Sequence, residues 1–164
     1  MTIPIKNSEE IEKMRLAGRL AAQLLDYIEP FIKPGVTTNE LNDLCHRYQL
    51  DIQGTIPAPL NYGQPPFPKS ICTSVNHVIC HGIPNDKLLK KGDIINIDVT
   101  VIKDGFHGDT SRMFTVGEVS PAAQRLINVT HECMMLGITQ VRAGVHLGNI
   151  LSLIHISEPT RLGM

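Results

Sequence analysis

The chain has 164 residues, of which 42% are hydrophobic and 19% are charged, and its net charge is −1 at pH 7. This length and composition suit one globular core and argue against intrinsic disorder. The charges are scattered, so there is no basic stripe of the kind that binds nucleic acid. We find no signal-peptide core and no apolar run long enough to span a membrane, and four cysteines are too few for a disulfide scaffold. We therefore expect a cytoplasmic protein that binds neither nucleic acid nor a membrane.

Two helices are expected ahead of the first strands. Asn7 is a good capping residue before an acidic first turn, and apolar residues then recur at helical spacing until Pro30 stops the run. Thr37 and Glu40 have the spacing of a capping box, which predicts a second helix after the turn at Pro34. Both helices should place an apolar face on a core.

A proline-rich segment follows these helices. Residues 54–68 hold five of the eleven prolines of the chain. Proline at this density prevents a helix or a central strand, so the segment should form an extended and fairly rigid loop. Tyr62 and Phe67 on this loop could line a pocket, although aromatic residues in loops more often only anchor the loop.

The segment 70–84 has β-prone residues on both sides of a central Asn-His pair. It contains four possible metal ligands, Cys72, His77, Cys80 and His81. The spacing from Cys72 to Cys80 does not fit the closely spaced ligand pairs of structural zinc sites. His81 precedes the flexible Gly82 and is well placed to reach into a site, although a surface position is the commoner case for a histidine.

Residues 92–114 predict two β-strands joined at Asp104 and Gly105, a dipeptide favoured in tight hairpin turns. With this turn, Lys103 pairs with Phe106, Thr100 with Asp109, and Asp98 with Ser111. The core face should carry Ile95, Ile97, Val99, Val101, Phe106 and Phe114. The polar face should carry Asn96, Asp98, Thr100, His107, Asp109 and Ser111.

Asp98 and Asp109 are diagonal neighbours on the polar face, roughly 7 Å apart at the backbone. Two carboxylates this close repel each other unless a proton, a basic group or a metal ion lies between them. Aspartates on a strand can also be no more than the wet face of an antiparallel sheet. However, Asp is disfavoured in strand interiors, and the opposite face is strongly β-prone. The pattern alone leaves a metal or acid/base role and a wet sheet face equally open.

A second copy of the first helical region begins after the hairpin. Ser120 and Pro121 start a helix that should run to about Val141. The segment that follows can be laid over residues 32–41 at a constant offset of 109. The matched pairs are Ile32 and Val141, Lys33 and Arg142, Gly35 and Gly144, Val36 and Val145, and Leu41 and Ile150. This match indicates an internal duplication of a helix, a Gly-Val turn, a second helix and a sheet.

The last residues depart from that pattern. The run LSLIHISEPTR, from Leu151, does not continue the expected helix and resembles the translation of an adapter used in sequencing libraries. We therefore expect residues 1–150 to be the native part and residues 151–164 to be a non-native tail. A native strand-and-turn tail is the alternative.

Four motifs together resemble the type I methionine aminopeptidases of bacteria, which belong to the M24 metallopeptidases. They are IEKMRLAGRLAA, KPGV, PKSICTSVNHVICHGIP and GDIINIDVTVIKDGFHGDTSRMF. The resemblance covers roughly residues 3–150. It implies the pita-bread fold, an α/β fold of α+β type with helices on one face of an antiparallel sheet. The fold has two related halves, so we expect a C-terminally truncated chain that holds the first half and the start of the second.

The resemblance also implies an activity. The family removes the initiator methionine from nascent polypeptides when the next residue is small, so the ribosome becomes a possible partner. It uses two divalent metal ions, for which carboxylate and imidazole ligands allow Co, Fe, Mn or Zn. Some members also bind one monovalent cation. A full-length protein of this kind should be a monomer in the cytoplasm.

Site residues follow from the motifs one by one. The resemblance implies metal ligands at Asp98 and Asp109, a catalytic and substrate-contacting histidine at His81, a methionine pocket near Cys72, Tyr62 and Phe67, and a monovalent-cation site at the backbone of Asn76 and Val78. Two departures stand out: the proline-rich loop is longer than usual, and nothing matches the three ligands of the second half. We therefore expect the chain to be inactive by itself. The alternatives are a non-catalytic binding module and a related metallohydrolase acting on proline or creatine substrates.

Overall fold

The computed structural model describes residues 3–152, and the chain divides into two compact units after Glu118. The helices and strands, in chain order, are α1 (Ser8–Ile28), the 3₁₀ turn η1 (Glu29–Phe31), α2 (Thr38–Arg47), the π-helical segment η2 (Tyr48–Gln53), β1 (Ile56–Pro57), β2 (Cys72–Val75), β3 (Ile94–Lys103), β4 (Phe106–Thr115) and α3 (Pro121–Thr139). The predicted helices and the predicted hairpin are confirmed. Within residues 3–152, no helix is both long enough and apolar enough to cross a membrane.

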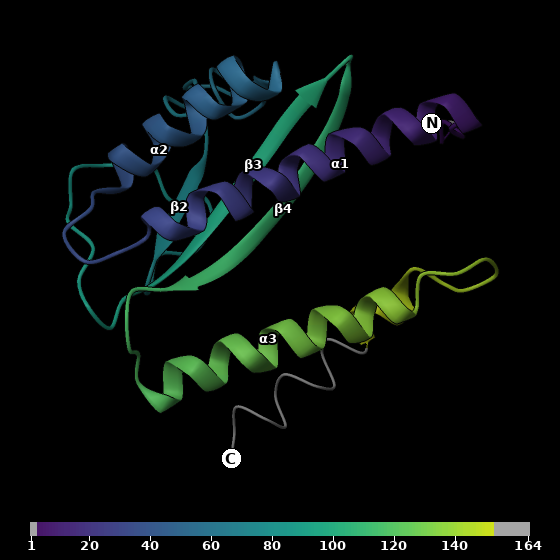
Figure 1. The fold of residues 1–164 in the computed structure, drawn as a ribbon. Coiled ribbons are helices and arrows are strands. Elements are labelled where there is room, and N and C mark those ends of the chain that lie inside the picture. Colours follow the sequence, from purple (N-terminus) through teal and green to yellow (C-terminus); the bar gives the residue numbers. More distant parts are fainter. Residues whose placement is uncertain (1–2, 153–164) are drawn as a thin grey trace. The chain divides into compact units, whose positions relative to one another are not determined.

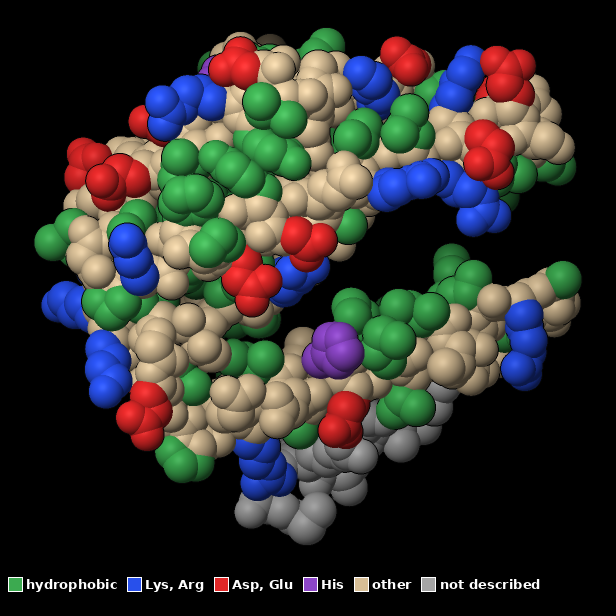
Figure 2. Space-filling model, in the orientation of Figure 1, with side chains coloured by type: hydrophobic (Ala, Val, Ile, Leu, Met, Phe, Trp, Pro, Cys, Tyr) green, Lys and Arg blue, Asp and Glu red, His purple; other side chains and the backbone are tan. Residues whose placement is uncertain are grey.

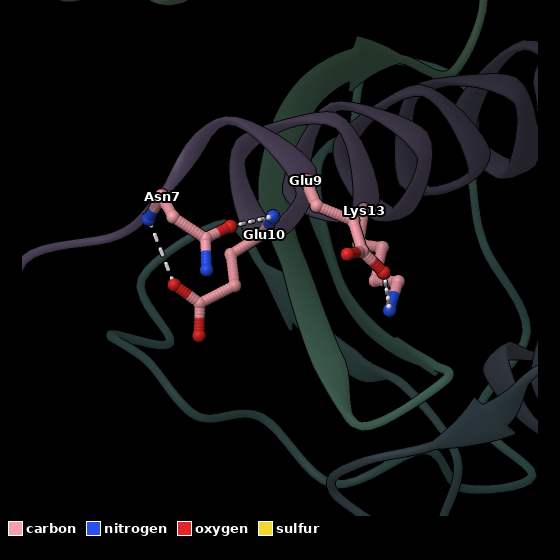
Figure 3. Close-up of polar contacts among 4 residues, drawn as sticks. All are labelled: Asn7, Glu9, Glu10 and Lys13. Carbon is pink, nitrogen blue, oxygen red and sulfur yellow. Dashed lines mark hydrogen bonds and ion pairs between the residues drawn. The ribbon is translucent and has the colours of Figure 1, made fainter.

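The first helix starts where its capping residues lie (Figure 3). The Glu10 amide donates to Asn7 Oδ1 at 3.0 Å, and the Asn7 amide donates to Glu10 Oε2 at 2.8 Å. One turn on, Lys13 pairs with Glu9 at 2.7 Å. The second helix has the predicted capping box at Thr37. Each box satisfies backbone N–H groups that have no partner inside the helix, which fixes where the helix begins.

The sheet is built around β3. Asp104 and Gly105 adopt positive φ angles of 51° and 82°, as a tight turn between β3 and β4 requires. The register is the predicted one: Lys103 faces Phe106, Thr100 faces Asp109, and Asp98 faces Ser111. The other edge of β3 pairs antiparallel with β2 and with the short β1. The proline-rich segment therefore contributes an edge strand that the sequence analysis did not predict.

One face of this sheet is covered by helices, as Figure 1 shows for α1 crossing the β3–β4 hairpin. Four β3 residues on that face are fully buried, Ile95, Ile97, Val99 and Val101. They form one core cluster with apolar residues of α1 and α2. Burial of these aliphatic side chains is the main force that holds the helices on the sheet.

Gly108 marks the closest approach between α1 and the sheet. It lies on β4 opposite Val101, and an added Cβ would overlap the Ala17 carbonyl and the Gly18 amide of α1. Only a residue without a side chain allows the helix backbone to come this near the strand. This contact fixes the height of α1 above the strand that also carries Asp109.

The structure corrects two expectations, one about the burial of Phe106 and one about the length of the strand in segment 70–84. Phe106 lies on the core face, but it is only partly buried and has Lys6 and Lys13 near its ring rather than a place in the core cluster. The β-prone run in segment 70–84 forms a strand only up to Val75, because Asn76 turns the chain with a φ of 54°. Past that turn the backbone has no strand partner for most of its length.

The second unit repeats the backbone of the first at the predicted offset. Gly35 and Gly144 have positive φ angles of 88° and 81°. The Val36 amide donates to the Lys33 carbonyl at 3.3 Å, and the matching amide of Val145 donates to the carbonyl of Arg142 at 3.3 Å. A new helix then begins at residue 148 and includes residues 151 and 152. It therefore continues past residue 150, where the sequence analysis expected the helix to stop and the non-native tail to begin. The rest of the expected tail lies outside the described residues.

Candidate active site

The sheet face that points away from α1 and α2 brings Cys72 beside the two aspartates. In the register of β2, β3 and β4, Cys72 pairs with Asp98, and Asp98 pairs with Ser111 on the far side. Asp109 pairs with Thr100 and is therefore the diagonal neighbour of Asp98 on the same face. The sequence analysis predicted the aspartate pair, but the neighbouring cysteine comes only from the pairing of β2.

A cleft of about 550 Å³ opens over this face. Its lining comprises Ala58, Pro59, Tyr62, Pro65, Phe67, Cys72, His81, Asp98, Thr100, His107 and Asp109. Six residues named from the sequence as metal, catalytic or substrate-binding candidates therefore meet in one cleft. They come from three separate stretches of the first unit, which close on one another through the sheet.

His81 reaches the cleft because the next residue is fastened to β2. The Thr73 amide donates to the Gly82 carbonyl at 2.8 Å, and the Gly82 amide donates to Ser74 Oγ at 3.1 Å. A Cβ at Gly82 would overlap the Thr73 carbonyl, so no other residue fits this close approach. The glycine thus works as a fixed anchor for His81, whereas the sequence analysis treated it as a flexible neighbour.

The proline-rich loop forms one wall of the cleft. The Ala58 amide donates to the Thr100 carbonyl at 3.0 Å, which ties the start of the loop to β3. The loop then closes on itself, since the Phe67 amide donates to the Tyr62 carbonyl at 2.8 Å and the Phe67 carbonyl accepts from the Asn61 amide at 2.8 Å. Tyr62 remains 77% exposed, so its ring stands at the mouth of the cleft.

The neighbours of Asp98 in the cleft shift its pKa in opposite directions. Burial raises the pKa of the Asp98 carboxyl, and the nearby Asp109 carboxylate raises it further, while the His81 imidazole acts in the other direction. Burial also raises the pKa of the Cys72 thiol, to about 11, with help from Asp98. The thiol therefore stays protonated at neutral pH. The aspartate pair is an acidic site that lacks enough positive charge to balance it.

A divalent cation would balance the negative charge of the aspartate pair. Carboxylate oxygens are suitable ligands for Mn, Fe, Co and Zn, and a cation between the two carboxylates would remove their repulsion. Two carboxylates make an incomplete ligand set, however. In the part of the chain that the structure describes, no group of three or more His, Cys, Asp or Glu side chains could hold a metal ion.

The remaining candidates lie elsewhere. Asn76 and Val78 line a different hollow, of about 470 Å³, together with His77. The Asn76 side chain is already engaged, since it donates to Asp93 at 2.9 Å and accepts from the Ile94 amide at 3.0 Å. A monovalent-cation site at this backbone stays a prediction. The four-ligand zinc alternative is not supported, because His77 faces this hollow while Cys72 and His81 line the cleft.

Sequence reasoning did not assign a role to several cleft residues. Thr100 and His107 were placed on the polar face, and their position beside Asp109 was the signal available for them. Ala58 and Pro59 gave no signal, because an apolar loop residue is ordinary until the fold brings it over a site. His107 is exposed and adds a second imidazole to the cleft.

Comparison with known proteins shows the family of the chain. The model of metallopeptidase family M24 matches residues 12–156. The methionine aminopeptidase of Rickettsia prowazekii is 61% identical over 92% of this chain and 57% of that protein. That of Escherichia coli K12 is 54% identical over 92% of this chain and 56% of that protein. The crystal structure of the Rickettsia prowazekii enzyme matches with a TM-score of 0.92 and 58% identity, covering 95% of this chain and 62% of that chain.

The fold of the described residues is the pita-bread fold of the solved structures that this chain matches, of which it covers a part. The chain belongs to metallopeptidase family M24, whose members bind divalent metal ions. It spans 57% of the length of the Rickettsia prowazekii relative. The Xaa-Pro dipeptidase of Bacillus anthracis also matches, with a TM-score of 0.81, but at 22% identity it shows only the shared fold.

The raised pKa of Asp98 predicts how stability depends on pH. A folded-state pKa above the unfolded value means that the folded chain holds the proton more tightly, so this contribution is present at low pH and is lost as the pH rises through the folded pKa. We therefore expect metal-free Asp98→Asn protein to resist urea better than wild type at pH 7. This advantage should shrink as the pH falls toward the ordinary pKa of aspartic acid. Asp51→Asn, outside the cleft, should show no such trend, and an Asp98→Asn protein that is weaker at every pH would contradict the argument.

Proposed function

We propose that this chain forms one wall of the active site of a methionine aminopeptidase, which hydrolyses the bond after the N-terminal methionine of nascent polypeptides. The observation that carries the proposal is the cleft that joins Asp98, Asp109 and His81. The names of the relatives at 54–61% identity support the substrate class. We further propose that the protein acts in the cytoplasm, on chains emerging from the ribosome, and that it works as a monomer.

In this proposal Asp98 and Asp109 hold divalent metal, with two ions bound in the complete enzyme. When bound there, a divalent metal would make a water nucleophilic at neutral pH and would polarise the scissile carbonyl. Burial and the Asp109 carboxylate raise the pKa of Asp98, so a cation beside it would favour its charged form. The ion would be Co, Fe, Mn or Zn, which carboxylate and imidazole ligands accept.

The other cleft residues would handle the substrate. His81, held rigidly by Gly82, would donate a ring N–H to the scissile amide and orient it for attack. Protonated Cys72 and the rings of Tyr62 and Phe67 would surround the methionine side chain with apolar and polarisable groups. Water adds to the carbonyl carbon, the C–N bond breaks, and the departing amine takes up a proton.

A chimera tests the proposal. Residues 1–150 joined to the part of the Rickettsia prowazekii relative that this chain does not match should release methionine from Met-Ala-Ser when supplied with Mn²⁺ or Co²⁺. Changing Asp98 to asparagine in this chimera should reduce the rate by at least about a hundredfold, since even residues behind metal ligands often cost 10–100-fold. Asp51→Asn should leave the rate unchanged.

The 164-residue chain should be inactive under the same conditions, because its described residues supply only two carboxylates to the site. Methionine release by this chain at the rate of the chimera would contradict that expectation. A folded chimera that binds peptide without cleaving it would favour the non-catalytic binding module. Cleavage of Xaa-Pro substrates in place of Met-Ala-Ser would favour the proline-directed alternative.

A further inference from the structure

The first unit has a second hollow, which we call the β2 hollow, with a volume of about 470 Å³. Its lining includes Thr38 from the start of α2, Thr73 from β2, and Lys87 and Lys90 from the segment 76–93, which joins β2 to β3. It shares no lining residue with the cleft that holds the aspartate pair. The proposed peptidase chemistry therefore does not use this hollow.

Two lysines give the β2 hollow an excess of positive charge. Among the described residues, neither Lys87 nor Lys90 forms an ion pair through its ammonium group. Figure 2 shows Lys and Arg side chains along the left edge of the view, where the loop between β2 and β3 lies in Figure 1. The lining also contains Asp93, which already accepts from Asn76 Nδ2 at 2.9 Å and from the Lys90 amide at 2.8 Å. One carboxylate does not balance two ammonium groups.

The Thr73 hydroxyl is the second feature of the β2 hollow that calls for a ligand. Thr73 pairs with Ile97 and is only 4% exposed. Its amide donates to the Gly82 carbonyl, but its hydroxyl has no hydrogen-bond partner among the described residues. A buried hydroxyl without a partner is costly, and a bound water or ion is a common explanation for one. An acceptor bound in the hollow would give this hydroxyl its partner.

The start of α2 favours an anion as that acceptor. Thr38 is the first residue of this ten-residue helix, so the positive end of the helix dipole lies at the hollow. The Thr38 hydroxyl accepts from the Asn85 amide at 2.8 Å and donates to the Asn85 carbonyl at 3.1 Å. These bonds fasten the segment 76–93 to the helix, so the wall that carries the lysines is preformed.

We propose that the β2 hollow binds a phosphate group, either as free phosphate or as the monoester of a small organic molecule. Lysine binds phosphate as a point charge, and the Thr73 hydroxyl would donate to a phosphate oxygen. The hollow is larger than phosphate needs, and Val75 and Leu89 in its lining would contact an organic part. The predicted monovalent-cation site concerns main-chain atoms of Asn76 and Val78, so the two sites use different groups.

Titration of the 164-residue chain tests this site directly. Inorganic phosphate and ribose 5-phosphate are each titrated calorimetrically into the chain, in a phosphate-free buffer at constant ionic strength. We expect saturable binding to one site per chain. Tighter binding of ribose 5-phosphate would identify an organic phosphate as the ligand, and equal binding would identify the phosphate group alone.

Two adjacent lysines give a matched pair of variants. Lys90 lines the hollow, whereas Lys91 lies outside it and pairs with Glu118 at 3.6 Å. Lys90→Gln should weaken phosphate binding at least about tenfold, because it removes a hydrogen bond to a charged group. Lys91→Gln should change the affinity by no more than about twofold, although it removes the same charge from the chain.

Thr73→Val separates a binding role of the hydroxyl from a structural one. Valine keeps the shape of threonine but has no hydroxyl, so the variant should bind phosphate about fivefold less tightly. Without phosphate it should resist urea at least as well as wild type, because the unpaired buried hydroxyl is gone. A hydroxyl needed only for the fold would instead lower the resistance to urea.

Three outcomes would overturn the proposal. The first is the absence of saturable binding of either phosphate compound to a chain that circular dichroism shows to be folded. The second is an equal loss of affinity in the two lysine variants, which would indicate attraction to the net charge alone. The third is unchanged phosphate affinity in Thr73→Val. None of these outcomes bears on the metal-dependent activity of the chimera, which tests the proposed function separately.

Discussion

Replacing Asp98 or Asp109 by asparagine is expected to lower the affinity of the chain for Mn²⁺ or Co²⁺ by at least about tenfold. Losing a residue behind a metal ligand often costs 10–100-fold, so losing a ligand itself should cost no less. Both carboxylates face one cleft, and the repulsion between them is what a cation would relieve. Isothermal titration of the metal into each variant measures the effect.

The pair also predicts a pattern among the variants. If both carboxylates hold the same cation, the double variant should bind hardly less well than either single one, because each single change already empties the site. Asp51→Asn, which removes a carboxylate outside the cleft, should bind as wild type does. Unchanged affinity in both single variants would show that the carboxylates form only the wet face of the sheet.

Replacing Gly108 by alanine should destabilise the first unit by about 3 kcal/mol, at the upper end of the cost of overpacking. The added methyl would meet the Ala17 carbonyl and the Gly18 amide, and a helix backbone cannot move aside as a flexible side chain can. Relief requires α1 to lift off β4, which would loosen the core beneath it. Urea unfolding followed by circular dichroism measures the change.

Gly18 provides the matched control for this contact. It lies on α1 next to Ala17, and an added Cβ there would meet nothing within 4 Å apart from its chain neighbours and the adjacent backbone of its own helix. Alanine is a better helix former than glycine by about 1 kcal/mol, so Gly18→Ala should be neutral or mildly stabilising. Equal destabilisation by the two substitutions would mean that the close contact at Gly108 is not the cause. Gly108 precedes Asp109 on β4. If Gly108→Ala destabilises this part of the strand, it should therefore also weaken metal binding by Asp109.

Much of the fold was predictable because it follows from local rules. A capping side chain decides where α1 begins, and Asp104-Gly105 decides the hairpin turn, because few other residues adopt those backbone angles. Once the turn is fixed, strand geometry alone pairs Thr100 with Asp109 and places the two aspartates diagonally on one face. The repeat at an offset of 109 was likewise predictable from the sequence, because two turns with the same backbone conformation need the same kinds of residue.

The rest of the site depends on contacts between distant parts of the chain. Nothing near Cys72 in the sequence indicates that β2 lies beside β3, so the neighbour of Asp98 could not be derived from strand patterns. His81 reaches the cleft through bonds from Gly82 to a strand eight or nine residues earlier. The rigidity of the proline-rich loop was predictable from its composition, but its position over the polar face was not.

The sequence by itself determined the helices, the hairpin and its register, the aspartate pair and the family. Each of these depends on residues a few positions apart, or on motifs long enough to be specific. Only the tertiary structure decided which side chains share the cleft with that pair, and that Gly82 is bonded to β2 beside His81. Those features arise when segments far apart in the chain pack together. The contacts that stabilise them lie between segments, so the sequence of any one segment does not predict them.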